Sequence, residues 1–339
     1  MPGGHRDAQK LGRVAAIIPC HNEAKAIARV VDDLRTAVPG IEIFVYDNAS
    51  TDDTAAIARA AGAHVRTEER KGKGNVIRRA FADVDADIYL LIDGDDTYDA
   101  AAAPELIAAV ADGPVDHVTG VRRATVASAY RPSHESGNRF FNRVVTAIFR
   151  YPVTDMLSGY RAFSRRYVKS FPAVSTAFEI ETEMTVHAVN ARVPQREIPV
   201  AFKDRAAGTE SKLRTYRDGT KILWMILRLL YHERPLMLSA AGSLILLLIT
   251  ALLMGPVLLE YVETGLVPRF PTVIVSASLL VVAMVVLLMG LLLDGLRKIR
   301  SELARAAYLA QPAPPHWSKT AADPMPGDAA RWADGRSER

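Results

Sequence analysis

The sequence of 339 residues is nearly free of cysteine, since Cys20 is the only one. A single cysteine excludes an intrachain disulfide and fits a reducing compartment. Near the N-terminus, Pro2, Gly3 and Gly4 precede a polar stretch, and no long apolar signal region follows. We therefore expect the large domain after it to stay on the cytoplasmic side of the membrane.

Charge is missing from two long stretches near the C-terminus. Leu236 to Leu259 has 24 residues and Thr272 to Leu293 has 22, and each contains 18 apolar residues. Helices of these lengths rise about 36 and 33 Å, enough to cross a hydrocarbon layer of roughly 30 Å. A buried hairpin in a soluble core is the alternative, but the complete lack of charge favours two membrane spans.

Basic residues flank the outer ends of these two stretches. The linker between them, Glu260 to Pro271, holds a single basic residue, Arg269. By the positive-inside tendency, both termini face the cytoplasm. The flanking basic residues are Arg228, Arg234, Arg297, Lys298 and Arg300.

The net charge of +4 can be assigned to one stretch. Phe202 to Arg234 contains eight lysines and arginines and four acidic residues, an excess equal to that of the whole chain. Arg214, Arg217 and Lys221 are spaced as on one face of a helix, with apolar residues on another face. This pattern predicts an amphipathic helix on an anionic membrane surface. Nucleic-acid binding is the rival explanation, which the adjacent spans disfavour.

In the first half of the chain, short apolar runs alternate with stretches of helical spacing. This alternation predicts an α/β fold with a mostly parallel sheet covered on both faces. After about residue 120 the alternation weakens, although Val193–Phe202 still reads as a strand and Glu179–Asn190 as a helix. The other predicted strands are Val14–Pro19, Ile41–Tyr46, His64–Arg66 and Ile88–Ile92, and the other predicted helices end at Ala37 or span Asp52–Ala61, Asn75–Ala82 and Pro104–Ala111.

Ligands of such sheets bind at the carboxyl ends of the strands, so we look for chemistry there. Asp47 ends the second strand, where a carboxylate can accept from a base N–H or a ribose hydroxyl, and a turn residue is the alternative. Asp52 is expected to cap the next helix. The run from Arg70 to Asn75 offers glycines and cations to an anion at a helix N-terminus. It lacks the spacing of a P-loop, and a solvated basic loop is the simpler interpretation.

The strongest local signal is an acidic loop after the fourth strand. Four acids occur in the seven residues from Asp93 to Asp99. Carboxylates so close together repel one another unless a cation compensates them. Oxygen ligands of this kind suit Mg²⁺ or Mn²⁺, which binds through one or two carboxylates together with phosphate and water.

Taken together, the ordered motifs resemble family 2 glycosyltransferases with the GT-A fold. They are Pro-x-x-Asn-Glu at Pro19, the Asp47 region, Gly-Lys-Gly-Asn at Gly72 and Asp-Gly-Asp at Asp93. With the later Asp155-x-x-Ser-Gly-Tyr-Arg and Arg-x-x-Gly-x-x-Ser-Lys-Leu, they are similar to the subgroup of dolichol-phosphate mannose synthase and bacterial polyprenyl-phosphate glycosyltransferases. The resemblance covers about residues 13 to 220, and two C-terminal spans match one branch of that subgroup.

This resemblance implies roles for individual residues. One group would hold the nucleotide, a second the metal and the reaction centre, and a third the acceptor phosphate. The nucleotide-binding residues would be Pro19, His21, Glu23, Asp47, Lys73 and Asp93; the metal ligands Asp93 and Asp95; the catalytic residues Asp95 and Asp96; and the acceptor-phosphate residues Arg122, Arg139, Arg205 and Lys212. The usual motif of the subgroup is Asp-Ala-Asp-x-Gln/His. Because this chain has Gly94, Asp96 and Thr97 instead, the second metal ligand would come from Asp96 or Thr97.

The implied reaction moves a sugar from a nucleotide diphosphate sugar to polyprenyl phosphate at the cytoplasmic membrane, with inversion, for envelope glycan or glycosylation pathways. A UDP-sugar is favoured over GDP-mannose because the acidic motif departs from the mannose-synthase form. A tethered transferase with a non-lipid acceptor, a non-catalytic nucleotide-sugar binding protein and a processive polysaccharide synthase are the rivals. The last usually carries a Gln-x-x-Arg-Trp motif, and none of the three tryptophans lies in one.

These patterns predict a division of the chain into seven segments. The spans contain the small residues Gly242, Ser243 and Ser276, which could pack between protomers of a homo-oligomer. Disorder is expected in the tail from Gln311 onward. The segments are a flexible N-terminus (1–12), a GT-A domain (13–212), a juxtamembrane amphipathic helix (213–234), a first span (235–259), an extracytoplasmic loop (260–271), a second span (272–294) and a cytoplasmic tail (295–339).

Overall fold

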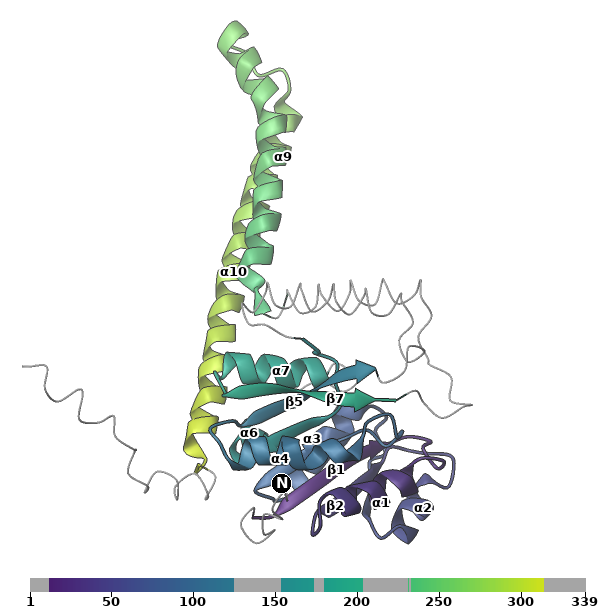
Figure 1. The fold of residues 1–339 in the computed structure, drawn as a ribbon. Coiled ribbons are helices and arrows are strands. Elements are labelled where there is room, and N and C mark those ends of the chain that lie inside the picture. The colour runs from purple at the N-terminus through teal and green to yellow at the C-terminus, as the bar shows by residue number, and fades with distance from the viewer. Residues whose placement is uncertain (1–11, 125–153, 174–179, 204–230, 232, 314–339) are drawn as a thin grey trace, which may run out of the picture. The chain divides into compact units, whose positions relative to one another are not determined.

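The computed structural model describes residues 12–124, 154–173, 180–203, 231 and 233–313 (Figure 1). Residue contacts divide the chain into two compact units, which are described separately. We call them the sheet unit (Met1–Pro132, Val153–Ser211 and Ala304–Arg339) and the apolar-helix unit (Ser133–Pro152 and Lys212–Leu303). The predicted amphipathic helix, apart from its last residues, and the tail beyond residue 313 lie outside the described residues.

The sheet unit is built on a seven-stranded sheet with the strand order β3-β2-β1-β4-β6-β5-β7. Strands β1, β2, β3 and β4 pair in parallel, as do β5 and β7, while β6 pairs antiparallel to both of its neighbours. The predicted α/β class with a mostly parallel sheet is therefore confirmed. The strands are β1 (Val14–Cys20), β2 (Glu42–Asp47), β3 (His64–Thr67), β4 (Ile88–Leu91), β5 (His117–Ala124), β6 (Arg161–Ser164) and β7 (Gln195–Phe202).

Helices provide the apolar surfaces that cover both faces of this sheet. The predicted helices of the first half of the chain are present, with ends that differ by a few residues. The helices of the sheet unit are α1 (Ile27–Ala37), α2 (Thr54–Ala60), α3 (Lys73–Asp83), the short 3₁₀ helix η2 (Ala100–Ala102), α4 (Ala103–Ala111), α6 (Arg165–Ser170) and α7 (Ile180–Asn190).

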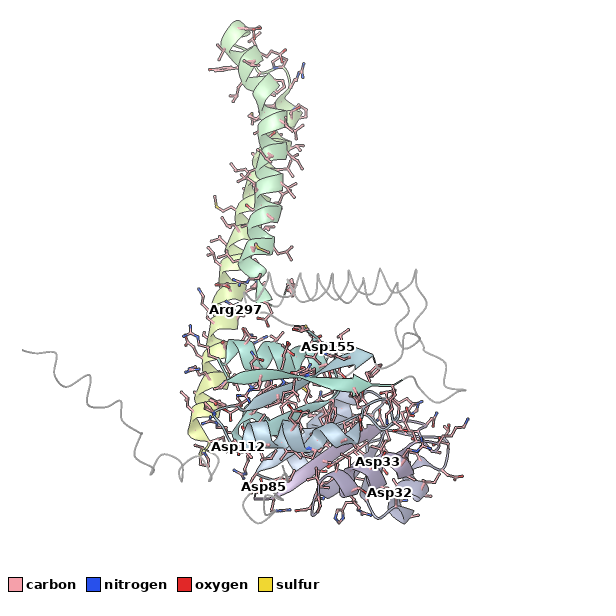
Figure 2. All side chains as sticks on the ribbon, in the orientation of Figure 1. Asp32, Asp33, Asp85, Asp112, Asp155 and Arg297 are labelled. Carbon is pink, nitrogen blue, oxygen red and sulfur yellow. The ribbon has the colours of Figure 1, made fainter. Side chains whose placement is uncertain are left out.

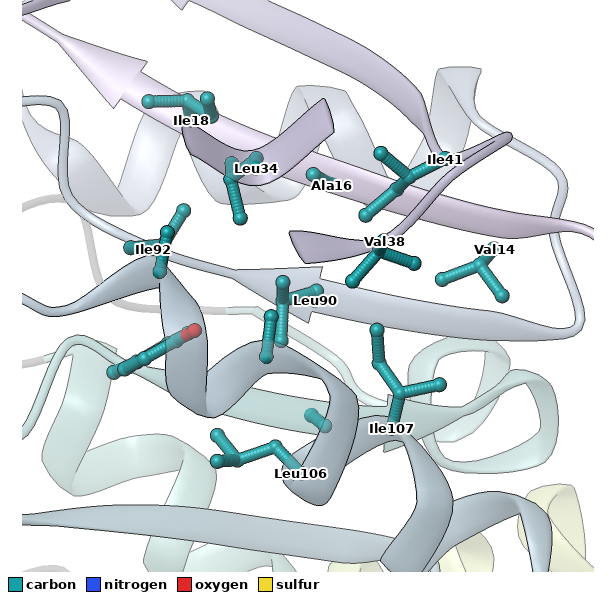
Figure 3. Packing of buried hydrophobic residues seen from close by; sticks show 14 of the residues in the cluster. Val14, Ala16, Ile18, Leu34, Val38, Ile41, Leu90, Ile92, Leu106 and Ile107 are labelled. Carbon is teal, nitrogen blue, oxygen red and sulfur yellow. The ribbon is translucent and has the colours of Figure 1, made fainter. Parts of the chain in front are cut away.

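Strand β1 shows why the sheet has two covered faces. Its alternate side chains Ala16 and Ile18 belong to a core cluster with residues of α1 and α4 (Figure 3). The intervening side chain Ile17 belongs to a second cluster with residues of α3, α6 and α7. Since successive strand residues point to opposite faces, a continuous apolar run fits burial on both sides. Each such isoleucine stabilises the fold by about 1.5–3 kcal/mol.

The two charge-free stretches lie within helices α9 (Pro235–Thr264) and α10 (Phe270–Ala310), whose most apolar segments of 18 residues have mean hydropathies of 2.4 and 2.8. Both are long and apolar enough to cross a membrane. Helix α10 continues past Asp294, the end of the predicted span, where Arg297 and Lys298 pair with Asp294 one turn away. These pairs favour helix continuation.

Small residues lie where α9 and α10 approach each other. A Cβ atom at Gly290 would overlap the side chain of Ser239. Ser243 and Ser276 are buried within the single chain. The packing of these residues between protomers stays a prediction.

The last residues of α10 belong to the sheet unit. Tyr308 is buried in the second core cluster and donates a hydrogen bond of 2.6 Å to Asp116. Arg166 donates two bonds to the same carboxylate and lies 4.7 Å from the Tyr308 ring centroid. Arg305 donates to the Ala191 carbonyl at 2.6 Å. The end of α10 is thus an integral part of the core of the sheet unit.

The Tyr308 contact predicts that truncation of this side chain costs more stability than truncation of its neighbour Leu309. We expect Tyr308→Ala to destabilise the sheet unit by about 3–5 kcal/mol, because a buried ring and a hydrogen bond to a carboxylate are lost. The matched control Leu309→Ala removes an exposed side chain and is expected to change stability by about 0.5 kcal/mol or less. Unfolding of the purified chain, followed by near-UV circular dichroism, measures both. Equal effects of the two substitutions would contradict this description.

Candidate active site

Three neighbouring parallel strands end at the same edge of the sheet. Cys20 at the end of β1 is in register with Asp47 at the end of β2, and β4 pairs with β1 on the other side. The backbone N–H of Asn48 donates to the Cys20 carbonyl at 2.8 Å, which continues this alignment past the strands. The segments that follow β1, β2 and β4 therefore begin at one edge, as expected for a parallel sheet.

Asn48 connects this edge to the loop that precedes α3. Its side-chain amide donates to the carbonyls of Glu68 and Arg70, each at 2.8 Å, and accepts from the N–H of Gly72 at 2.7 Å. The carbonyl of Asn48 lies 2.8 Å from Nδ1 of His21. Because Gly72 has a φ of 126°, a value that glycine adopts most easily, the loop turns directly into α3.

Asp47 carries an unsatisfied acceptor at this edge. The side chain is buried, and its Oδ1 has no hydrogen-bond partner among the described residues. A buried carboxylate oxygen without a donor costs free energy that a ligand N–H or hydroxyl can recover. This supports the base or ribose contact predicted for Asp47.

The first residue of α3 places an ammonium group between two carboxylates. Lys73 Nζ lies 2.5 Å from Asp93 Oδ1 and 2.6 Å from Glu181 Oε1. Asp93 follows β4, whereas Glu181 is in the first turn of α7. Burial alone lowers the pKa of Lys73, but Asp93 and Glu181 outweigh it and hold this pKa above its usual range. Lys73 therefore carries a positive charge.

The acidic loop after β4 separates its carboxylates. Asp95 is buried and accepts a 2.6 Å hydrogen bond from the Thr97 hydroxyl. Asp96, with a left-handed φ of 58°, accepts from Arg29 of α1 at 3.0 Å. The two residues considered for the second metal ligand thus have other partners: Asp96 has Arg29, and Thr97 has Asp95.

The donor set at the end of β4 fits a hard divalent cation. Asp93 and Asp95 offer carboxylate oxygens on either side of Gly94. No group of three or more His, Cys, Asp or Glu side chains that could hold a metal occurs in the part of the chain that the structure describes. A cation that uses one or two protein carboxylates and completes its coordination with phosphate and water matches this set.

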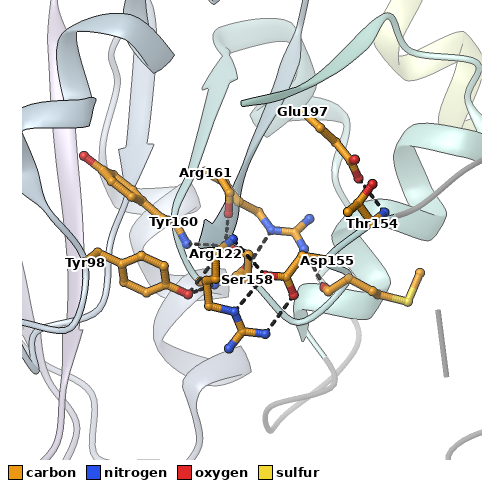
Figure 4. A network of polar contacts seen from close by, with 11 residues as sticks. Tyr98, Arg122, Thr154, Asp155, Ser158, Tyr160, Arg161 and Glu197 are labelled. Carbon is orange, nitrogen blue, oxygen red and sulfur yellow. Dashed lines mark hydrogen bonds and ion pairs between the residues drawn. The ribbon is translucent and has the colours of Figure 1, made fainter. Parts of the chain in front are cut away.

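A polar network connects Tyr98, near the acidic loop, with the segment that precedes β6 (Figure 4). The fully buried Arg161 donates to the carbonyls of Ser158 and Met156 at 2.9 and 2.7 Å. The Tyr98 hydroxyl accepts from the N–H of Gly159 at 2.9 Å. Burial lowers the pKa of Arg161. These bonds hold the segment before β6 in place.

Gly159 brings that segment against Asp93. A Cβ atom at Gly159 would overlap the Oδ2 atom of Asp93. Lys73 contacts the other oxygen of the same carboxylate, Oδ1. Asp93 is therefore contacted by a backbone at one oxygen and by an ammonium at the other, while part of its side chain remains exposed.

Two comparisons decide the family. The model of glycosyl transferase family 2 matches residues 15–171. Glycosyltransferase AglJ of Haloferax volcanii is 35% identical over 225 residues, which cover 66% of this chain and 74% of that protein. The chain belongs to glycosyl transferase family 2. It is an enzyme of the glycosyltransferase class, as the resemblance of its motifs predicts.

Further similarities concern a second relative and a solved structure. The dolichyl-phosphate hexose transferase of Haloferax volcanii is 27% identical over 221 residues, covering 65% of this chain and 95% of that protein. Glucosyl-3-phosphoglycerate synthase from Mycobacterium tuberculosis, solved with Mn²⁺, UDP and glucosyl-3-phosphoglycerate, has a TM-score of 0.53 and 24% identity, covering 65% of this chain and 79% of that one. This likeness confirms the predicted GT-A fold.

The predicted residues of this glycosyltransferase are only partly within the described structure. Among the acceptor-phosphate residues, Arg122 makes a bidentate ion pair with Asp155, with both N–O distances 2.7 Å, and lies 5.5 Å from the Phe202 ring centroid. Arg139, Arg205 and Lys212 lie outside the described residues. Of the nucleotide group, Pro19 lies on β1, His21 contacts Asn48, and the Glu23 N–H donates to Thr54 at 2.9 Å.

Sequence reasoning missed several residues of this site. Glu181 gives no local signal, because it comes close to Lys73 only in the folded chain, where α3 and α7 contribute to the same core cluster. Asn48 could have been suspected, since it directly follows Asp47 at a strand end. The predicted cap is displaced by one residue, because the N-cap position of α2 is Asp53. Asp52 lies just before it and accepts from the N–H groups of Thr54, the first residue of α2, and of Ala24 in the loop after β1.

Gly94, which replaces the usual alanine of the acidic motif, predicts how substitutions at Gly94 and Cys20 affect stability together. A Cβ atom at Gly94 would lie 2.5 Å from the buried Cys20 Sγ and 3.4 Å from Ile18. We expect Gly94→Ala to destabilise the sheet unit by about 1–3 kcal/mol through overpacking. Adding Cys20→Ala removes the sulfur and should recover most of that loss. The melting temperatures of the two single variants and the double variant test this. A double variant no more stable than Gly94→Ala would refute the packing explanation.

Proposed function

We propose that this enzyme moves a sugar from a nucleotide diphosphate sugar to a polyprenyl phosphate at the cytoplasmic face of the inner membrane. The observation that carries the proposal is the grouping of Asp47, Lys73 and the acidic loop at one edge of the sheet. An unsatisfied carboxylate, a buried cation and two hard oxygen donors match a base or ribose, a diphosphate and its metal.

Each group has a defined part in the proposed reaction. Asp47 accepts from the nucleotide, and the Lys73 ammonium faces the diphosphate oxygens. Asp93 and Asp95 would hold Mg²⁺ or Mn²⁺, which would supply stabilisation of the charge on the leaving diphosphate. Asp96, which pairs with Arg29, supports the loop. This arrangement favours Asp93 and Asp95 as the protein ligands of the metal.

The chemistry needs no protein base. An oxygen of the lipid phosphate forms a bond to the anomeric carbon while the bond to the nucleotide diphosphate breaks. A phosphate monoester has a second pKa near 6, so the nucleophile is already mostly dianionic at pH 7. In-line attack inverts the anomeric centre. The work of the protein is alignment of the two substrates and stabilisation of the leaving group.

The lipid acceptor is supported by two observations. Helices α9 and α10 are long and apolar enough to cross a membrane. A relative matched along 95% of its length is named dolichyl-phosphate hexose transferase. Arg122, held by Asp155, is the described cation that we assign to the acceptor phosphate, together with Arg139, Arg205 and Lys212. Both termini and the sheet unit lie on the cytoplasmic side in this proposal, and the seven predicted segments are retained.

The experiment is a donor-by-acceptor panel with the full-length chain in detergent. Radiolabelled UDP-glucose, UDP-N-acetylglucosamine and GDP-mannose are each incubated with Mn²⁺, with and without a polyprenyl phosphate. We expect label in the lipid fraction with a UDP-sugar. Asp95→Ala should lower the rate about 100-fold or more, because metal stabilisation of the leaving group is lost. Asp33→Ala, which removes an exposed carboxylate of α1 (Figure 2), should leave the rate unchanged.

Other outcomes separate the rival functions. Label in the lipid fraction with GDP-mannose alone would identify a mannose transferase. Label in a water-soluble product without lipid would indicate a tethered transferase with another acceptor. Full activity of Asp95→Ala would refute the metal assignment, and no transfer from any donor to any acceptor would refute the proposal.

A further inference from the structure

Lys73 and a divalent cation need the same carboxylate. Lys73 Nζ lies 2.5 Å from Asp93 Oδ1, and the backbone of Gly159 lies close to Oδ2. Asp93 is also a residue that the proposed function assigns to the metal. Like charges that share one carboxylate repel each other, and the repulsion is strong where water is excluded. A cation that binds Asp93 therefore competes with the ammonium that already pairs with it.

Glu181 is the second partner of Lys73, and it can compensate the ammonium charge when Lys73 moves away from Asp93. Its Oε1 lies 2.6 Å from Lys73 Nζ, and its Oε2 is buried without a hydrogen-bond partner among the described residues. Removing an ammonium from one carboxylate leaves a buried charge uncompensated unless another anion remains in contact. Glu181 keeps a negative charge at Lys73 after Asp93 is released, and its spare oxygen can accept a further N–H.

We propose that Lys73 is an internal competitor for the metal ligand Asp93, and that a nucleotide diphosphate relieves this competition by drawing the ammonium to its own oxygens. Glu181 is the positioning residue that holds Lys73 beside the site in both arrangements. The inference rests on the proposed function. Its consequence is that the divalent cation binds tightly only together with the nucleotide, since coupling between two ligands is reciprocal.

The test measures Mn²⁺ binding rather than turnover. Electron paramagnetic resonance of free Mn²⁺ gives the bound fraction for the full-length chain in detergent, first without nucleotide and then with UDP or GDP, against matched protein-free samples. We expect Lys73→Met to bind Mn²⁺ without nucleotide at least about tenfold more tightly than the wild type, because the competing charge is removed. Lys71→Met removes an exposed charge two positions away and should leave this affinity unchanged.

A second variant covers the case in which Lys73→Met does not fold. The double variant Lys73→Met with Glu181→Gln removes one buried cation and one buried anion together, and leaves Asp93 free to bind. It should show the same gain in Mn²⁺ affinity. If neither variant gains affinity while UDP or GDP still increases Mn²⁺ binding by the wild type, the competition is refuted and the proposed function stands. If no sample binds Mn²⁺ with or without either nucleotide, both are refuted.

Discussion

A positive charge buried at the edge of a sheet must be compensated by negative charge. The geometry of this site depends on the carboxylates that pair with the buried ammonium of Lys73. Lys73 opens α3, Asp93 follows β4 and Glu181 lies in α7, so three separate segments meet at one ammonium. Each of the three residues is positioned there because the helix or strand that carries it belongs to the sheet or packs on it. An ion pair in this setting contributes little net stability, but the loss of one partner is costly. The cluster therefore constrains the geometry of the strand ends.

The surroundings of the cluster are arranged to keep these segments in register. Asn48 fastens the loop before Lys73 to the ends of β1 and β2. Arg161 and Tyr98 hold the segment that carries Gly159 against Asp93. A glycosyltransferase that works by aligning two substrates needs such rigidity, because misplacement by about 1 Å can cost 100-fold in rate. The same residues that support the fold thus support the proposed catalysis.

Much of the first half of the fold could be predicted because β1, β2 and β4 are short, mostly apolar runs buried on both faces, whereas β3 at the sheet edge is mostly exposed. β5 and β6 escaped prediction because neither is a continuous apolar run. β5 contains Gly120, Arg122 and Arg123. β6 has only four residues and begins with Arg161, which donates to a carbonyl of its own loop. The acidic loop was recognised from composition, yet the pairing of Asp96 with Arg29 depends on a left-handed backbone that composition does not reveal. Glu181 required the tertiary packing of α7.

The most direct test of the account is a double-mutant cycle between Lys73 and Glu181, measured by urea unfolding of the purified chain. Lys73→Met leaves the carboxylates of Asp93 and Glu181 without their shared cation, so it should lower the free energy of unfolding by about 3–5 kcal/mol. Glu181→Gln leaves Lys73 paired with Asp93 and should lower it by a smaller amount. The double variant should lose at least about 1 kcal/mol less than the sum of the two losses, because the two groups compensate each other. Losses that add to within about 0.5 kcal/mol would contradict the claim that this ion pair organises the site.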